Sequence, residues 1–227
     1  MKITPLKLII LVLSVVVLTD DMCFGSDDFQ WWNSANTAFE LSEKWTFTVE
    51  EQLRMGDDAG TVVRHHSDFG VVYHNLADWI DFGINYRSIE KKTDNGDWNH
   101  TDRGHINFTF YGKLFGRELS NRLRFEYDSG QRIDDFGTFR NKFTLSPPFE
   151  LHPRREIFKS YTIKPYASYE LFYDTLDDKI TKHRFSAGLS LKLSENWFSK
   201  IYYMRQESSS SINSDLNVLG LQIKYLF

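Results

Sequence analysis

Most of the chain alternates between apolar and polar residues, one position at a time, over long segments. A period of two is typical of β-strands whose two faces meet different surroundings, and no helix-period segment of useful length stands out. The segments run for roughly ten to fourteen residues, whereas strands in soluble domains average about five or six. One such segment, residues 80–87, places Ile80, Phe82, Ile84 and Tyr86 on one face.

The length of these strands and the charge on their polar face favour a membrane. A tilted strand needs about nine to eleven residues to cross a bilayer. In a transmembrane barrel the apolar face meets lipid and the polar face lines a wet lumen. We therefore expect an all-β transmembrane antiparallel up-and-down β-barrel of about ten strands, with twelve as the alternative. The expected strands are 45–55, 61–74, 79–91, 102–115, 119–128, 136–146, 162–174, 180–193, 197–207 and 216–227.

Charged residues recur on the polar face, and most of them are basic. Eleven of fifteen such positions are Lys or Arg. One interpretation is an anion-selecting pore. The other, which we favour, is a ladder of charge pairs that plugs a barrel with little room for water. The predicted lumen residues are Glu50, Arg54, Arg64, Asp68, Arg87, Arg122, Arg124, Glu126, Arg140, Lys142, Lys164, Glu170 and Arg184, followed by Lys192 and Lys200.

The connections between strands fall into two groups. Short turns end in Trp45, Trp79 and Trp197, and an even number of expected strands separates each from the next. The other group is longer and acidic. Because outer-membrane barrels have short periplasmic turns and aromatic girdles, we predict a periplasmic girdle of Trp45, Trp79, Trp197 and the terminal Phe227. We also expect that deleting Phe227 impairs membrane assembly.

The N-terminus differs from the rest of the chain. Residues 8–18 are an apolar run behind Lys2 and Lys7, too short to span a bilayer as a helix and the length of a signal-peptide core. We expect a signal peptide at 1–25 and a barrel domain at 26–227. Cys23 is the single cysteine of the 227 residues. Segment 26–44 has no certain place: it lies in the lumen, packs below the barrel, or adds a strand.

Partners and localisation follow from the same features. We expect the bacterial outer membrane, reached through the periplasm, with lipid and lipopolysaccharide around the barrel. The C-terminal strand would engage the barrel-assembly machinery. A net charge of −4 gives no pull toward nucleic acid. A soluble periplasmic barrel that binds lipid or glycan is a weaker alternative, and the oligomeric state is open.

One pair of residues suggests catalysis. His65 and Ser67 share the predicted lipid-facing side of one strand, where a His can take the Ser proton so that the oxygen attacks an ester. We found no Asn or Asp to orient the His, so a barrel-wall role is favoured over an esterase or phospholipase. His66, Asp68 and His74 share the other face, but the two histidines are too far apart for one ion, and we predict no metal site.

Several segments, in order, resemble one bacterial family. They are "SDFGVVY" (67–73), "NYR" (85–87), "NRLRFEYD" (121–128), "FRNKFTL" (139–145), "KPYASYELFYD" (164–174), "HRFSAGL" (183–189) and "YYMRQ" (202–206). This pattern resembles the uncharacterised outer-membrane proteins grouped as domain of unknown function 2490. The resemblance implies an outer-membrane barrel. It supplies no activity, no cofactor and no catalytic residue.

Overall fold

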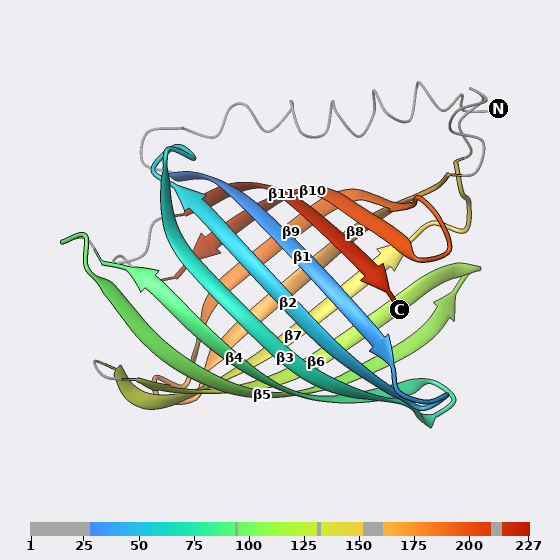
Figure 1. Ribbon diagram of the computed structural model, residues 1–227, viewed down its shortest axis with the longest axis horizontal. Coiled ribbons are helices and arrows are strands. Elements are labelled where there is room, and N and C mark those ends of the chain that lie inside the picture. Colours follow the sequence, from blue (N-terminus) through green and yellow to red (C-terminus); the bar gives the residue numbers. More distant parts are fainter. Residues whose placement is uncertain (1–27, 94, 131–132, 152–160, 210–214) are drawn as a thin grey trace.

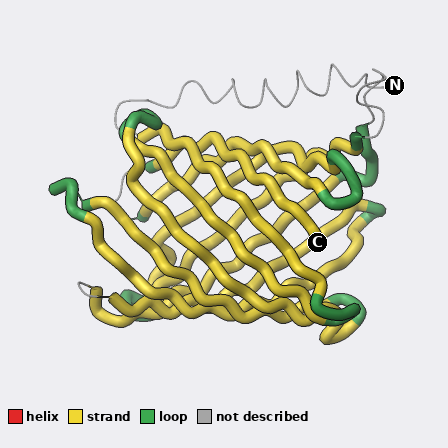
Figure 2. The backbone as a smooth tube through the Cα atoms, viewed as in Figure 1, coloured by secondary structure: helices red, strands yellow, loops and turns green. Residues whose placement is uncertain are grey.

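The computed structural model describes residues 28–227 except 94, 131–132, 152–160 and 210–214. The predicted signal peptide with Cys23 lies outside the described residues. Eleven strands make up nearly all of the described chain, and Figure 2 shows them as one continuous wall. They are β1 (Asp28–Glu40), β2 (Trp45–Gly56), β3 (Thr61–Ala77), β4 (Ile80–Lys92), β5 (Trp98–Leu114), β6 (Arg117–Gly130), β7 (Ile133–Ser146), β8 (Thr162–Asp174), β9 (Lys179–Lys192), β10 (Trp197–Ser208) and β11 (Leu216–Leu226).

The eleven strands form a closed barrel in which each strand pairs with its neighbours in sequence. Ten of the pairings are antiparallel. The eleventh joins β1 to β11 in parallel, from Asp28 opposite Leu216 to Ala38 opposite Leu226. Figure 1 shows the two arrowheads pointing the same way. The expectation that all neighbours are antiparallel is therefore wrong at this seam, because an odd number of strands leaves the first and last running in one direction.

The ten expected strands correspond to β2–β11 within four residues at every end. The additional strand is β1. Residues 28–40 of the segment 26–44, whose place was open, therefore form a strand of the barrel wall. The strand ends that flank 41–44, 78–79, 115–116, 147–161 and 193–196 lie at one end of the barrel, here called the turn end. The strand ends that flank 57–60, 93–97, 131–132, 175–178 and 209–215 lie at the other, the loop end. The expected difference in length is weak, since the longest interval between strands, 147–161, separates two strand ends at the turn end.

The barrel is polar inside and apolar outside. Among the described residues only six hydrophobic side chains are buried, against sixteen polar or charged ones. Large apolar side chains instead face outward on most strands, for example Phe69, Ile84, Phe125 and Ile201, each more than two-fifths exposed. No helix in the described part of the chain is long and apolar enough to cross a membrane. Folding in water buries apolar surface. The distribution of apolar and polar side chains in this barrel is therefore the reverse of that in a soluble domain.

An aromatic belt lines the part of the turn end formed by β10, β11 and β1–β5. Trp45 packs edge-on against Tyr73 with ring centroids 4.8 Å apart, and Trp197 packs on Tyr225 at the same separation. Phe227 stacks on Phe39 of β1 at 4.6 Å. Its backbone N–H donates to the carbonyl oxygen of Ala38 over 2.9 Å. Trp79 lies 5.8 Å from Phe110. Phe227 thus contacts β1 across the parallel seam and also belongs to the aromatic belt.

Candidate functional site

The barrel encloses two cavities that meet near its middle. The turn-end cavity measures about 370 Å³ and the loop-end cavity about 630 Å³. Six side chains line both, which places them at the boundary: Glu50, Arg87, Arg122, Arg124, Lys200 and Gln222. The charged lumen is the candidate site because these are the cavities that the polar faces of the strands create.

Ion pairs join strands along the inner wall of the barrel, and one group is centred on Asp68 of β3. The Arg87 Nε donates to Asp68 Oδ2 over 2.7 Å, and His105 Nε2 lies 2.9 Å from the same oxygen. The Asn85 amide donates to the other oxygen, Oδ1, over 2.7 Å. Asp68, Arg87 and His105 are all buried. The carboxylate of Asp68 therefore has a donor on each oxygen and ties β3 to β4 and β5.

The second group is centred on Glu126 of β6 and Glu170 of β8. Arg140 of β7 reaches both, donating to Glu126 Oε1 over 2.6 Å and to Glu170 Oε1 over 2.8 Å. Arg103 of β5 donates to Glu126 Oε2 over 2.6 Å and to both oxygens of Asp128 over 2.5 Å. Such charge-assisted pairs are about twice as strong as neutral hydrogen bonds. We call the two groups together the septum: Asp68, Arg87, Arg103, His105, Glu126, Asp128, Arg140 and Glu170.

The loop-end cavity has an excess of positive charge. Twelve Lys or Arg residues line it against five Asp or Glu. Two of the arginines meet at Trp32 of β1, where the Cζ of Arg54 is 3.6 Å and that of Arg184 is 5.4 Å from a ring centroid. Trp32 also packs against Met204 and Val218. This wall of the cavity is thus an aromatic ring covered by guanidinium groups.

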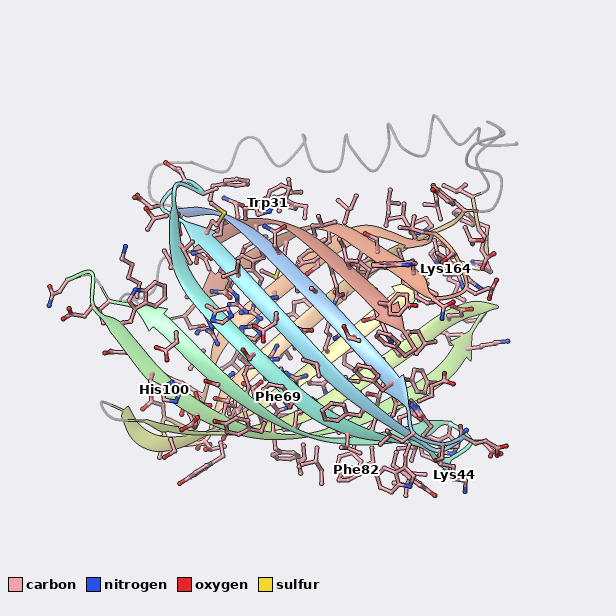
Figure 3. All side chains as sticks on the ribbon, in the orientation of Figure 1. Trp31, Lys44, Phe69, Phe82, His100 and Lys164 are labelled. Atoms are coloured by element: carbon pink, nitrogen blue, oxygen red, sulfur yellow. The ribbon has the colours of Figure 1, made fainter. Side chains whose placement is uncertain are left out.

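Of the fifteen predicted lumen positions, thirteen line these cavities. The other two lie at the turn-end rim: Lys164 pairs with Glu118 at 3.1 Å and Glu150 at 3.3 Å, and Lys192 pairs with Glu195 at 2.8 Å. Figure 3 shows Lys164 near this rim. Sequence reasoning missed three septum members that share the parity of predicted residues: Arg103, His105 and Asp128.

The two residues considered for catalysis, for which a barrel-wall role was favoured, lie on the outer face of β3 and are not joined by a hydrogen bond. His65 Nε2 lies 2.8 Å from Glu51 Oε2 of β2, and both side chains are more than two-fifths exposed. No hydrogen bond joins His65 to Ser67, although Ser67 is the register partner of Glu51. The signal for Glu51 was present in the sequence, because an acid interrupts the apolar series between Val49 and Leu53.

The inward histidines have partners of their own. His66 lies 3.4 Å from Glu50, and His74 lies 3.0 Å from Asp81. Among the residues that the structure describes, no group of three or more His, Cys, Asp or Glu side chains has an arrangement that would hold a metal ion.

Comparisons with solved structures give distant barrels. LpxR from Salmonella typhimurium aligns with a TM-score of 0.48 at 11% identity, over 80% of this chain and 83% of that one. The β domain of the Bordetella autotransporter BrkA gives 0.42 at 10% identity, over 74% and 79%. The translocator domain of NalP from Neisseria meningitidis gives 0.33 at 12%, over 88% and 89%. We take the architecture from the strand pairing itself, since these scores lie below 0.5.

Sequence comparison identifies the family. No curated protein matches the chain. A family model described as "Protein of unknown function (DUF2490)" matches residues 29–217, which run from the start of β1 into β11. The family resemblance expected from the sequence is thereby confirmed. This chain belongs to the DUF2490 family.

Proposed function

We propose that the protein is a non-enzymatic outer-membrane β-barrel that forms a narrow, anion-favouring channel. The observation that carries the proposal is the excess of basic side chains around the loop-end cavity, twelve Lys or Arg against five Asp or Glu. A ring of cationic side chains lowers the energy of an anion entering a narrow pore and raises that of a cation. Six side chains line both cavities where they meet, so we expect the channel to be of low conductance.

The proposal includes the location and partners expected from the sequence. The apolar exterior and the aromatic belt support insertion in a bilayer, with lipid and lipopolysaccharide around the wall. Export by the signal peptide 1–25 and assembly through the C-terminal strand belong to the same proposal. We infer no cofactor and no nucleic-acid partner.

Conductance of the refolded protein in a planar bilayer tests the channel. In a KCl gradient we expect small current steps whose reversal potential indicates chloride preference. Lys200 lines both cavities and its ammonium lies 5.6 Å from the Tyr166 ring centroid. The variant Lys200→Gln should therefore reduce the preference. Lys44→Gln changes the same charge in an exposed turn and should not. Cation preference, or no current above a protein-free bilayer, would contradict the channel and leave a structural role.

A second candidate function is hydrolysis of a lipid ester at His65 and Ser67. The observation that favours it is Glu51, whose carboxylate lies 2.8 Å from His65 Nε2 and can orient the His65 ring. In this mechanism Ser67 gives its proton to His65 while its oxygen attacks the ester carbonyl. Ser67 must first rotate toward His65, since no hydrogen bond joins them.

Assaying purified protein on phospholipid vesicles tests hydrolysis. Ser67→Ala and Glu51→Gln should both reduce the rate, whereas Ser88→Ala, which removes the outward serine opposite Ser67, should not. An absent activity, or one that Ser67→Ala leaves unchanged, eliminates this candidate.

A further inference from the structure

We infer that the loop end of the barrel contains a binding site for a phosphate-bearing anion, formed by Arg54 and Arg64, which line the loop-end cavity, and by the exposed Lys91 beside them. These three residues are consecutive register partners on β2, β3 and β4: Arg54 is opposite Arg64, and Arg64 is opposite Lys91. Each belongs to the inward-facing series of its strand. Like charges directly opposite each other on a sheet are destabilising. A row of three cations therefore favours a negative charge between them.

No side chain in the described part of the barrel supplies that charge. Arg54 donates to the neutral Gln52 Oε1 over 2.6 Å and stacks on Trp32. The Nε of Arg64 is buried without a hydrogen-bond partner. Within the described part of the chain, no carboxylate lies within ion-pair distance of Arg54, Arg64 or Lys91. A buried donor without a partner is destabilising, and an anion from solution would offset that cost.

A second pair of facing arginines has a carboxylate between its two positive charges. Arg124 and Arg140 are also opposite each other. There Glu126 Oε1 lies between them, 3.4 Å from Arg124 Nη1 and 2.6 Å from Arg140 Nη1. The position that Glu126 fills in the septum has no equivalent beside Arg54 and Arg64. We assign that position to the ligand.

The chemistry of the three side chains selects phosphate over chloride. A guanidinium group offers a planar fork that matches two oxygens of a phosphate, and an ammonium adds a point charge. Three cations suit an anion of charge about −2, which a phosphate monoester has near neutral pH. The site lies at the loop end of a cavity of about 630 Å³, which leaves room for a small organic group on the phosphate.

The inference rests on the basic loop-end cavity of the proposed function and not on conduction through it, so it is tested without current. Isothermal titration of inorganic phosphate into the refolded full chain should give saturable binding that chloride at equal ionic strength does not reproduce. Because hydrogen bonds to charged groups contribute about 1.5–3 kcal/mol, Arg64→Gln should weaken the affinity about tenfold or more. The double variant Arg54→Gln/Arg64→Gln should abolish saturation. The matched control Lys44→Gln/Lys113→Gln alters two exposed lysines away from the cavity and should bind as the wild type does.

A structural role for Arg64 predicts a different result. If Arg64 merely supports the fold, Arg64→Gln should lower the urea midpoint of unfolding in phosphate-free buffer. If it belongs to an anion site, the same variant removes like-charge repulsion and should keep or raise that midpoint. Absent saturation, equal binding of chloride, or wild-type affinity in the double variant would overturn the site while leaving an anion-selective current intact. Phosphate binding without any current would overturn the channel and keep the site.

Discussion

Arg140 holds two buried carboxylates at once, those of Glu126 and Glu170. Replacing it by Met would leave Glu170 without its closest cation and Glu126 with only one of its two cations at 2.6 Å. Breaking a buried pair by removing one partner costs about 3–5 kcal/mol. We therefore expect Arg140→Met to reduce the free energy of unfolding by about that amount, measured by urea unfolding in lipid vesicles.

Lys179 provides the control for this prediction, because it pairs with Asp177 at 2.9 Å with both side chains more than half exposed. Lys179→Met should leave the free energy of unfolding nearly unchanged, because exposed ion pairs contribute little. Similar effects of the two substitutions would show that the septum does not stabilise the barrel.

Gly220 illustrates a constraint of shape. Tyr202 is the register partner of both Gly220 on β11 and Gly188 on β9. A Cβ added at Gly220 would overlap the Tyr202 ring. Gly220→Ala should therefore displace that ring and destabilise the barrel by about 1–3 kcal/mol. The readout is the temperature at which the folded form is lost in heat-modifiable gel migration. Gly112→Ala, where a Cβ meets nothing within 4 Å, should leave that temperature unchanged.

At the scale of the strands, the parallel seam can be tested by cross-linking. Ala35 of β1 and Ile223 of β11 are register partners. Neighbouring strands lie about 4.8 Å apart, within the range of about 4.4–6.8 Å between Cα atoms that a disulfide spans. In a Cys23→Ser background, Ala35→Cys with Ile223→Cys should form a disulfide that changes gel mobility. Ala35→Cys with Ile201→Cys on β10 should not. The opposite outcome would contradict an eleven-stranded barrel.

Phe227 supports the same seam through its ring and its backbone. Deleting it removes the stack on Phe39 and the hydrogen bond to Ala38, so we expect less folded barrel in the outer-membrane fraction. Phe115→Ala alters an aromatic side chain that is 92% exposed at the same end of the barrel. Fractionation should show no loss for that control, and an equal loss in both variants would argue against a special role for Phe227.

The strands were predictable because alternation repeats on each of β2–β11. β1 was not, since it carries Trp31 and Trp32 side by side and has few charges, and since nothing local indicates that its partner is β11. The alternation also identified residues that line the cavities, which thirteen of the fifteen predicted lumen residues do. Which charge meets which depends on strand tilt and stagger, so the contact of Arg140 with Glu126 and Glu170 could not be read from spacing alone.

As a whole, the molecule is a charged core within an apolar wall, with distinct turn and loop ends. Figure 3 shows Lys44 at the turn end and His100 toward the other end. If the turn end faces the periplasm, an epitope inserted after Asp58 should bind antibody on intact cells. The same epitope after Glu43 should bind only after the outer membrane is permeabilised. The reverse pattern would invert the orientation.

The parallel seam also bears on the order of folding. The ten other strand pairings join strands that are neighbours in sequence, so their contacts form by closing short segments of chain. Asp28 instead pairs with Leu216, 188 positions further along. The entropy lost in closing a loop rises with its length, and contacts between distant residues slow folding. We therefore expect the sheet to grow hairpin by hairpin and to exist briefly as an open, curved ribbon. The joining of β1 to β11 is then the step that limits the rate.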